Sequence, residues 1–256
     1  MKVGLIGFGA IAKRLTFLLQ PEDDIHLVGA LVVNRDKWRE PGVNVCFAVE
    51  ELLAAGPEVV VEAGGHAALR AHGPDVLRAG VDLILVSVGA LADPECERSI
   101  VDAARVGNSR AVVASGAIGA LDALASAAIG GLSQVTHTTR KPARALLAAE
   151  EVRELSGPRE LFRGSAREGV LLFPESVNVA AAVSLAGIGL DRTELCVVAD
   201  PALERNTHEV VAVGAFGELR FSIENVPTAE NPKTGQIVAM SVLHCLRRRN
   251  APLAIG

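Results

Sequence analysis

The sequence predicts an α/β protein with a doubly wound parallel sheet, followed by a second α+β domain whose sheet is mainly antiparallel. Short apolar runs alternate with helical spacing from the N-terminus to Val113. After Ser115 the runs become longer and their residues alternate in polarity. Strands that are apolar throughout and alternate with helices are typical of a parallel sheet covered on both faces. Right-handed crossovers between such strands place helices on both faces of the sheet, which is the doubly wound arrangement.

The first half of the chain contains five expected strands and three expected helices. The apolar, β-rich runs are residues 3–6, 26–33, 58–62, 83–86 and 110–113. Helical spacing follows in residues 10–20, 67–79 and 95–106. Strands joined by helices in this order belong to successive βαβ units.

The second half has a different pattern. Residues 116–131 are rich in Gly and Ala, which predicts a closely packed helix. Strands are expected at residues 134–139, 194–198, 208–214 and 218–224, and Gly217 predicts a hairpin between the last two. A final helix is expected from about residue 232 to 248, ending in the basic run Arg247-Arg248-Arg249, which suits a helix C-terminus. We expect this helix to pack on the first domain.

Composition narrows the class of protein. The chain has 256 residues, half of them hydrophobic, and a net charge of -5. That charge argues against binding to a phosphate backbone, and the apolar stretches are shorter than the ~20 residues that span a bilayer. The four cysteines are far apart, so no CxxC pair and no metal-binding pattern exists: Cys46, Cys96, Cys196 and Cys245. Reduced thiols and no nucleic-acid or membrane partner indicate a cytoplasmic protein.

A glycine-rich turn joins the first strand to the first helix. Gly7, Gly9 and Ala12 form the pattern G-x-G-x-x-A. Gly7 permits the tight turn, Gly9 lets the backbone approach a pyrophosphate, and Ala12 keeps the helix close to the sheet. The N–H groups at the helix start, including those of Ala10 and Ile11, then face the anion. This pattern predicts a Rossmann domain that binds a dinucleotide.

The end of the second strand bears on the choice of cofactor. An acidic residue there binds the ribose hydroxyls of NAD, whereas an arginine accommodates the extra phosphate of NADP. The sequence offers Asn34 and Arg35, followed by Asp36. Asn34 can bind a ribose and Arg35 a phosphate. We therefore expect NAD or NADP to serve as cofactor.

The loops after later strands are expected to line the same cofactor site. Glu62-Ala63-Gly64 follows the third expected strand, and Ser87-Val88-Gly89-Ala90 follows the fourth. Small residues there leave room for the nicotinamide. His66, in the first turn of the next helix, is interpreted as a surface or capping residue.

The sequence of the second domain lacks the catalytic residues of two other groups of nicotinamide-dependent enzymes with this two-domain plan. Residues 114–119, where it begins, contain no nucleophilic cysteine, which argues against a thiohemiacetal mechanism. Paired histidines followed by lysine, as in a dihydrodipicolinate reductase, are also missing.

The remaining motifs together resemble those of the L-aspartate dehydrogenases. They extend over essentially the whole chain: GFGAIA, GAIGALDAL, TTRKP, NVAAAVSLAG, ADP…RNTHEV and NPKTG. The resemblance implies a Rossmann domain at residues 1–115, completed by the C-terminal helix at about 232–256, and a catalytic and dimerisation domain at 116–231. It implies oxidation of L-aspartate with NAD or NADP to iminoaspartate, which yields oxaloacetate and ammonia or enters pyridine nucleotide biosynthesis. It also implies a homodimer.

Residue roles carried over by the resemblance are few. His208, in NTHEV, is implied as the active-site histidine, and Ala117 and Asn178 as cofactor contacts. An imidazole suits such chemistry, because hydride leaves Cα only after the amine has lost a proton. A dicarboxylate substrate also needs fixed cations, for which the candidates are Arg140, Lys141 and Lys233.

Two alternatives to aspartate oxidation stay open at this point. One is a dehydrogenase of the same two-domain plan that acts on another amino or hydroxy acid. The other is a catalytically silent NAD(P)-binding regulator that senses redox state. A missing general base would favour the regulator, but the chain contains His208.

Overall fold

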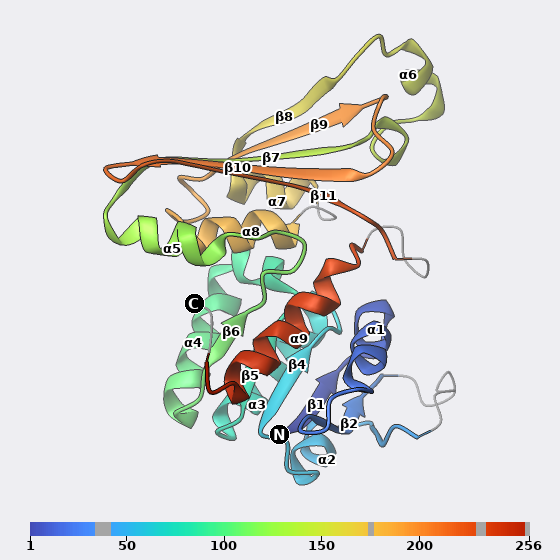
Figure 1. Cartoon of the computed structure of the whole chain (residues 1–256), viewed down its shortest axis with the longest axis vertical. Coiled ribbons are helices and arrows are strands. Elements are labelled where there is room, and N and C mark those ends of the chain that lie inside the picture. The colour runs from blue at the N-terminus through green and yellow to red at the C-terminus, as the bar shows by residue number, and fades with distance from the viewer. Residues whose placement is uncertain (34–41, 174–176, 229–233, 254–256) are drawn as a thin grey trace. The chain divides into compact units, whose positions relative to one another are not determined.

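The computed structural model describes residues 1–33, 42–173, 177–228 and 234–253 (Figure 1). The chain divides into two compact units. The first unit comprises Met1–Gly116 and Ile237–Gly256, and the second comprises Ala117–Gln236. Of the residues singled out in the sequence, Asn34, Arg35 and Lys233 lie outside the described residues.

A parallel sheet forms the centre of the first unit. Its six strands are ordered β3-β2-β1-β4-β5-β6 and all its ladders are parallel. The strands are β1 Lys2–Ile6, β2 His26–Leu31, β3 Val45–Cys46, β4 Val59–Glu62, β5 Asp82–Leu85 and β6 Ala111–Val113. Every residue of β4 and β5 is buried, as expected for central strands with both faces covered. The Rossmann part of the predicted fold class is confirmed.

Helices connect these strands, and their ends follow local sequence signals. They are α1 Ala10–Leu19, α2 Val49–Ala54, α3 His66–Arg78, the 3-10 turn η2 Val88–Ala92, α4 Pro94–Gly107 and α9 Ile237–Asn250. The Asp93 side chain caps α4 by accepting a hydrogen bond from the Glu95 N–H, and Asn108 ends the helix in the left-handed region. The last helix, α9, packs against α1 and ends in three arginines.

The second unit contains a mixed, mainly antiparallel sheet, which confirms the second part of the predicted fold class. Its five strands are ordered β11-β10-β7-β9-β8, and β7 and β9 are parallel neighbours. The strands are β7 Leu132–Pro142, β8 Arg159–Ser165, β9 Glu194–Asp200, β10 Asn206–Gly214 and β11 Gly217–Asn225. The predicted hairpin is present, with Gly214 opposite Gly217 and Gly217 at φ 117°.

Helices cover one face of this sheet (Figure 1). The helical segments of the second unit are α5 Leu121–Ile129, η3 Ala143–Ala145, α6 Ala149–Glu154, α7 Ala166–Leu172 and α8 Val177–Ala186. Leu124 of α5 and Val183 of α8 pack with Val135 of β7 and Val210 of β10 in a shared apolar core. The side chains of β7 and β10 that share the face of Val135 and Val210 therefore point toward the helices.

The structure differs from the prediction where the second unit begins. The expected helix over residues 116–131 is helical only at Leu121–Ile129. Gly116 and Ala120 have φ values of 63° and 56°, which are incompatible with a continuous right-handed helix. The prediction was also incomplete, since β8 and helices α6 to α8 had not been expected.

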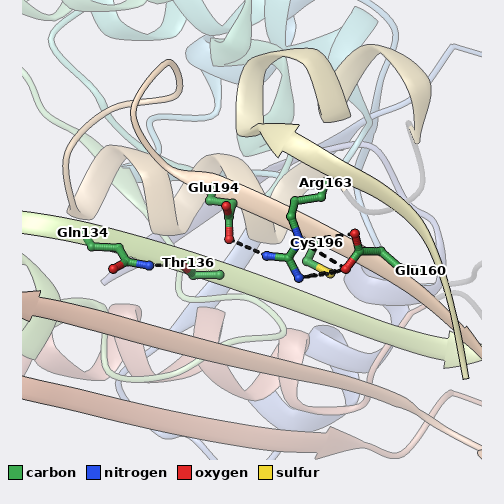
Figure 2. A network of polar contacts seen from close by, with 6 residues as sticks. All are labelled: Gln134, Thr136, Glu160, Arg163, Glu194 and Cys196. Carbon is green, nitrogen blue, oxygen red and sulfur yellow. Dashed lines mark hydrogen bonds and ion pairs between the residues drawn. The ribbon is translucent and has the colours of Figure 1, made fainter.

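On the sheet face opposite the helices, polar side chains form the network shown in Figure 2. The Arg163 guanidinium donates to the carboxylates of Glu160 and Glu194, with the shortest contacts at 2.7 and 2.6 Å. Cys196 Sγ donates to Glu160 at 3.3 Å. Burial first, and then this carboxylate, raises the pKa of the Cys196 thiol to about 11. The thiol is therefore protonated at neutral pH and is no nucleophile.

Candidate functional site

The turn after β1 requires a glycine at its first position. Gly7 has φ 85°, and a Cβ placed on it would lie 2.4 Å from the Cα of Gly64 and 2.9 Å from the carbonyl oxygen of Ala63. Only a residue without a side chain lets the two loops pack this closely. The sequence-predicted residues Gly7, Ala63 and Gly64 thus meet at the carboxyl edge of the sheet.

Gly9 has a different environment from Gly7. It is the N-cap of α1, and a Cβ there would meet no atom within 4 Å. No side chain caps the helix, and none of the described residues in its first turn is acidic. Ala12, one turn along, is completely buried and holds α1 against the sheet. A helix start with no side-chain cap and no acidic residue in its first turn, and with open space at the Cβ position of Gly9, suits an anion such as a pyrophosphate.

A buried carboxylate lies behind the two other predicted loops. Glu62, the last residue of β4, is 0% exposed. Its Oε1 accepts hydrogen bonds from the N–H groups of Gly64 and Gly65, both at 2.9 Å, and from the Ser87 hydroxyl at 2.8 Å. Its Oε2 accepts from the Ser87 N–H at 3.0 Å. Burial raises the pKa of Glu62, while these hydrogen bonds oppose the rise.

Strand alternation and register assemble the polar cluster of the second unit. His137, Thr139 and Lys141 occupy every second position of β7 and are buried, so they share one face of the sheet. His208 of β10 lies directly opposite Thr139 in the antiparallel ladder. These four residues share the helix-covered face with Val135 and are called the β7–β10 cluster below.

The two histidines of the β7–β10 cluster contact each other. His137 Nε2 lies 3.3 Å from His208 Nδ1, and the rings stack with centroids 5.5 Å apart. His137 is completely buried, and its Nδ1, like the Thr139 hydroxyl, has no partner among the described residues. Unpaired buried polar atoms are costly, so an apolar cluster here would favour folding more. Retaining polar groups at such a place is typical of a functional site.

Burial and charge keep both rings neutral. Burial lowers the pKa of His137 well below its usual value, and the neighbouring His208 lowers it further. Burial, followed by the Lys141 cation, lowers the pKa of His208 to about 4. At neutral pH His208 is therefore an uncharged imidazole that can take up a proton, beside a cation that can attract a carboxylate.

Comparison with known proteins places these units in a family. A family model described as "Aspartate dehydrogenase, C-terminal" matches residues 122–249, and one described as "Homoserine dehydrogenase, NAD binding domain" matches residues 7–114. The L-aspartate dehydrogenase of Ruegeria pomeroyi is 44% identical over 261 residues, covering 99% of this chain and 94% of that protein. The chain belongs to the L-aspartate dehydrogenase family. The resemblance inferred from the motifs is confirmed.

Other members of the L-aspartate dehydrogenase family agree over the whole length. The Methanosarcina acetivorans L-aspartate dehydrogenase is 41% identical over 270 residues, covering 100% of this chain and 99% of that protein. The crystal structure of the Thermotoga maritima aspartate dehydrogenase superposes with a TM-score of 0.83 at 29% identity and covers 100% of this chain and 99% of that one. The two-unit architecture is thus that of an aspartate dehydrogenase.

Three further residues that the sequence predicts as substrate or cofactor contacts, Arg140, Ala117 and Asn178, lie in different parts of the second unit. Arg140 is exposed and lies on the sheet face opposite Lys141 and His208. The carbonyl oxygen of Ala117 accepts a hydrogen bond from Asn225 Nδ2 at 2.9 Å, at the end of β11. Asn178 is exposed in the first turn of α8. Among the predicted cations that the structure describes, Lys141 is the one that joins His208.

Sequence reasoning placed Glu62 in a loop of the cofactor site without giving it a role of its own, and it missed His137. Glu62 ends the apolar run Val-Val-Val-Glu, and an acidic residue that closes a buried strand is a readable signal. His137 lies two positions before Thr139 and four before Lys141, so strand alternation alone places it on their face. Within the described ranges, no group of three or more His, Cys, Asp or Glu side chains is arranged to hold a metal ion, and no helix is long and apolar enough to cross a membrane.

Proposed function

We propose that the protein is an NAD(P)-dependent L-aspartate dehydrogenase. It oxidises L-aspartate to iminoaspartate, which hydrolyses to oxaloacetate and ammonia, and it can run in reverse. The observation that carries the proposal is the pairing of a neutral His208 with a buried Lys141 in a unit that matches the aspartate dehydrogenase C-terminal model. Such a pair supplies one group for a proton and one for a carboxylate.

The first unit is proposed to bind the dinucleotide and the second to carry catalysis and dimerisation. Gly9, Ala10 and Ile11 would receive the pyrophosphate at the start of α1, which the open space at the Cβ position of Gly9 and the lack of a side-chain cap support. The loops at Ala63–Gly64 and Ser87–Val88, together with Asn34, Arg35, Ala117 and Asn178, are the further contacts proposed. When bound, the nicotinamide cofactor supplies the hydride acceptor.

The second unit is proposed to prepare the amine. Lys141 binds one carboxylate of the substrate, and His208 takes a proton from the substrate ammonium. The nitrogen lone pair freed in this way forms the C=N bond as hydride leaves Cα. Pairing of Lys141 with a carboxylate offsets one of the two causes that lower the His208 pKa, so substrate binding makes the imidazole a better base. The protonated ring can later return its proton as water adds to the imine. Arg140 and Lys233 are the other proposed carboxylate ligands.

Reduced-nicotinamide absorbance tests the proposal. The purified protein is mixed with NAD or NADP and with aspartate, glutamate, alanine or malate in separate reactions. Formation of reduced cofactor with aspartate well above the other three is expected. Preference for another acid on the panel would reassign the substrate. Binding of NAD(P) without turnover of any of the four would support the redox-regulator alternative instead.

The protein is further proposed to be a cytoplasmic homodimer without a nucleic-acid or membrane partner. The described cysteines are all free thiols, in keeping with a reducing compartment. The resemblance to the family supports the dimer. Light scattering at micromolar concentration is expected to give twice the chain mass of 26.6 kDa, and a monomer mass would overturn it.

A further inference from the structure

Glu62 connects two segments that are far apart in the sequence and that both line the proposed cofactor site. The segments are the loop Ala63–Gly65, which leads into α3, and the residues Ser87–Val88, which lead into η2. Among the described residues, the four hydrogen bonds to the Glu62 carboxylate come from these two segments. We infer that Glu62 is a positioning residue, whose carboxylate fixes both segments in the conformation that receives the nucleoside part of the cofactor. This inference rests on the proposed cofactor site.

A carboxylate is the side chain that this arrangement demands. Four donors converge on two oxygen atoms, and an ionised carboxylate is acceptor-only with room for about four hydrogen bonds. The side chain is completely buried, so bulk solvent does not reach the carboxylate. If the carboxylate were absent, the buried Ser87 N–H would lose its acceptor, and the loop around Gly64 would lose its connection to Ser87.

The loop Ala63–Gly65, which Glu62 holds, also contacts the turn at Gly7 between β1 and α1. The Ala63 N–H donates to the Ile6 carbonyl at 2.9 Å, and Gly7 packs on Gly64 without room for a Cβ. A shift of the Ala63–Gly65 loop would therefore move the turn that precedes α1. Glu62 thus acts through three segments, although its own side chain is shielded from any ligand.

The same hydrogen bonds determine what this edge of the sheet can recognise. The N–H groups of Gly64, Gly65 and Ser87 and the Ser87 hydroxyl proton are already donated to Glu62. A phosphate needs donors, and the buried carboxylate would also repel it. The protons that Gly64, Gly65 and Ser87 donate to Glu62 are therefore not available to a phosphate at this edge. The phosphates are left to the start of α1.

The test compares two carboxylate-to-amide variants of the same sheet. Glu62→Gln keeps the shape but turns an NH₂ donor toward the N–H or hydroxyl donors that now point at the carboxylate. Asp82→Asn is the matched control. Asp82 is 7% exposed at the amino end of the neighbouring strand β5, and its carboxylate binds Arg110 and Arg249 far from both loops. The dissociation constant of NADH or NADPH is measured by fluorescence well below the melting temperature of each variant.

Both variants are expected to melt below wild type, but only Glu62→Gln should bind the reduced cofactor at least about tenfold more weakly. Equal cofactor affinity in folded Glu62→Gln and wild type would overturn the inference. An equal loss in both variants would also overturn it, because the effect would then reflect general stability. If wild type itself binds neither cofactor, the proposed function fails first, and this outcome is distinguishable from the other two.

Discussion

His137 Nε2 lies 3.3 Å from His208 Nδ1, which joins a completely buried ring on β7 to the proposed catalytic ring on β10. Since both rings are neutral, one nitrogen of the contact donates and the other accepts. The contact engages Nδ1 of His208 and leaves Nε2 as its second polar atom. The orientation of the ring is thereby fixed by a residue that cannot itself reach solvent.

Replacing His208 tests its role directly. If the ring moves the proton of the amine or of water, His208→Ala should lower kcat by roughly 10²–10⁴-fold and leave cofactor affinity unchanged. If the ring only holds a substrate carboxylate, KM should rise while kcat stays near wild type. Steady-state kinetics on aspartate and a melting curve on the same preparation separate these outcomes. A folded variant with wild-type kcat and KM would remove His208 from the mechanism.

Replacing His137 tests the histidine contact. His137→Phe fills the same space without a polar atom, so it should lower kcat roughly tenfold, the worth of about one buried hydrogen bond. His137→Gln can place an amide nitrogen near the position of Nε2 and should recover part of this loss. Thermal melting of both variants serves as the control for packing. Equal kcat in the Phe and Gln variants would show that the ring contributes only volume.

The buried histidines predict how stability depends on pH. The folded-state pKa of His208 is about 4, below its usual value of 6.5, and the pKa of His137 is lowered as well. Between pH 4 and 6.5 the unfolded chain therefore binds more protons than the folded protein. Stability is therefore complete above about pH 6.5 and falls as the pH drops toward 4, with His208 contributing a loss on the order of 3 kcal/mol.

Urea denaturation at pH 7, 6, 5 and 4.5 measures this dependence. Because His208→Gln lacks the titrating ring, its free energy of unfolding should decline less steeply than that of wild type over the same range. Other groups titrate in both proteins, so the difference between the two curves reports His208 together with its effect on His137. Parallel curves would contradict the burial of a neutral ring at this position.

The two glycines of the first turn should respond differently to substitution. Gly7→Ala forces a Cβ to within 2.4 Å of the Gly64 backbone at a φ of 85°, so it should destabilise the protein by about 2 kcal/mol or more. A Cβ at Gly9 meets no atom within 4 Å, so Gly9→Val should leave the fold nearly intact. Its side chain would instead occupy the space proposed for the pyrophosphate and should weaken cofactor binding more than about tenfold.

Melting curves and NADH titrations on both glycine variants check this contrast. The affinity for aspartate at saturating cofactor should change little in Gly9→Val. Unchanged cofactor affinity in Gly9→Val would rule out the start of α1 as the pyrophosphate site, whatever the melting curves show.

Patterns among residues close in the sequence predicted much of the secondary structure. The strand–turn–helix at Gly7, the hairpin at Gly217 and the alternation in β7 each depend on residues close in sequence, and the structure contains all three. The helix expected at 116–131 is shorter than predicted because Gly116 and Ala120 have positive φ values, and a positive φ at Ala120, a residue with a Cβ, leaves no mark in composition. Helices α6 to α8 were missed for a related reason, since short helices are stabilised by packing more than by propensity.

By itself, the sequence determined the two-part α/β plan, the family, and a set of candidate residues that includes His208 and Lys141. The two-part plan follows from the periodicity of strands and helices, which is a local property. The family and the role of His208 follow from the resemblance of the motifs to those of the L-aspartate dehydrogenases, and Lys141 was a candidate because a dicarboxylate substrate needs a cation. Only the tertiary structure decided that Glu62 accepts from Ser87, 25 positions later, and that His137 meets His208, 71 positions later. It also decided that Lys141, and not the adjacent Arg140, shares a face with His208. Sheet order and register set these relationships, and a shift of one residue in a strand would exchange its two faces.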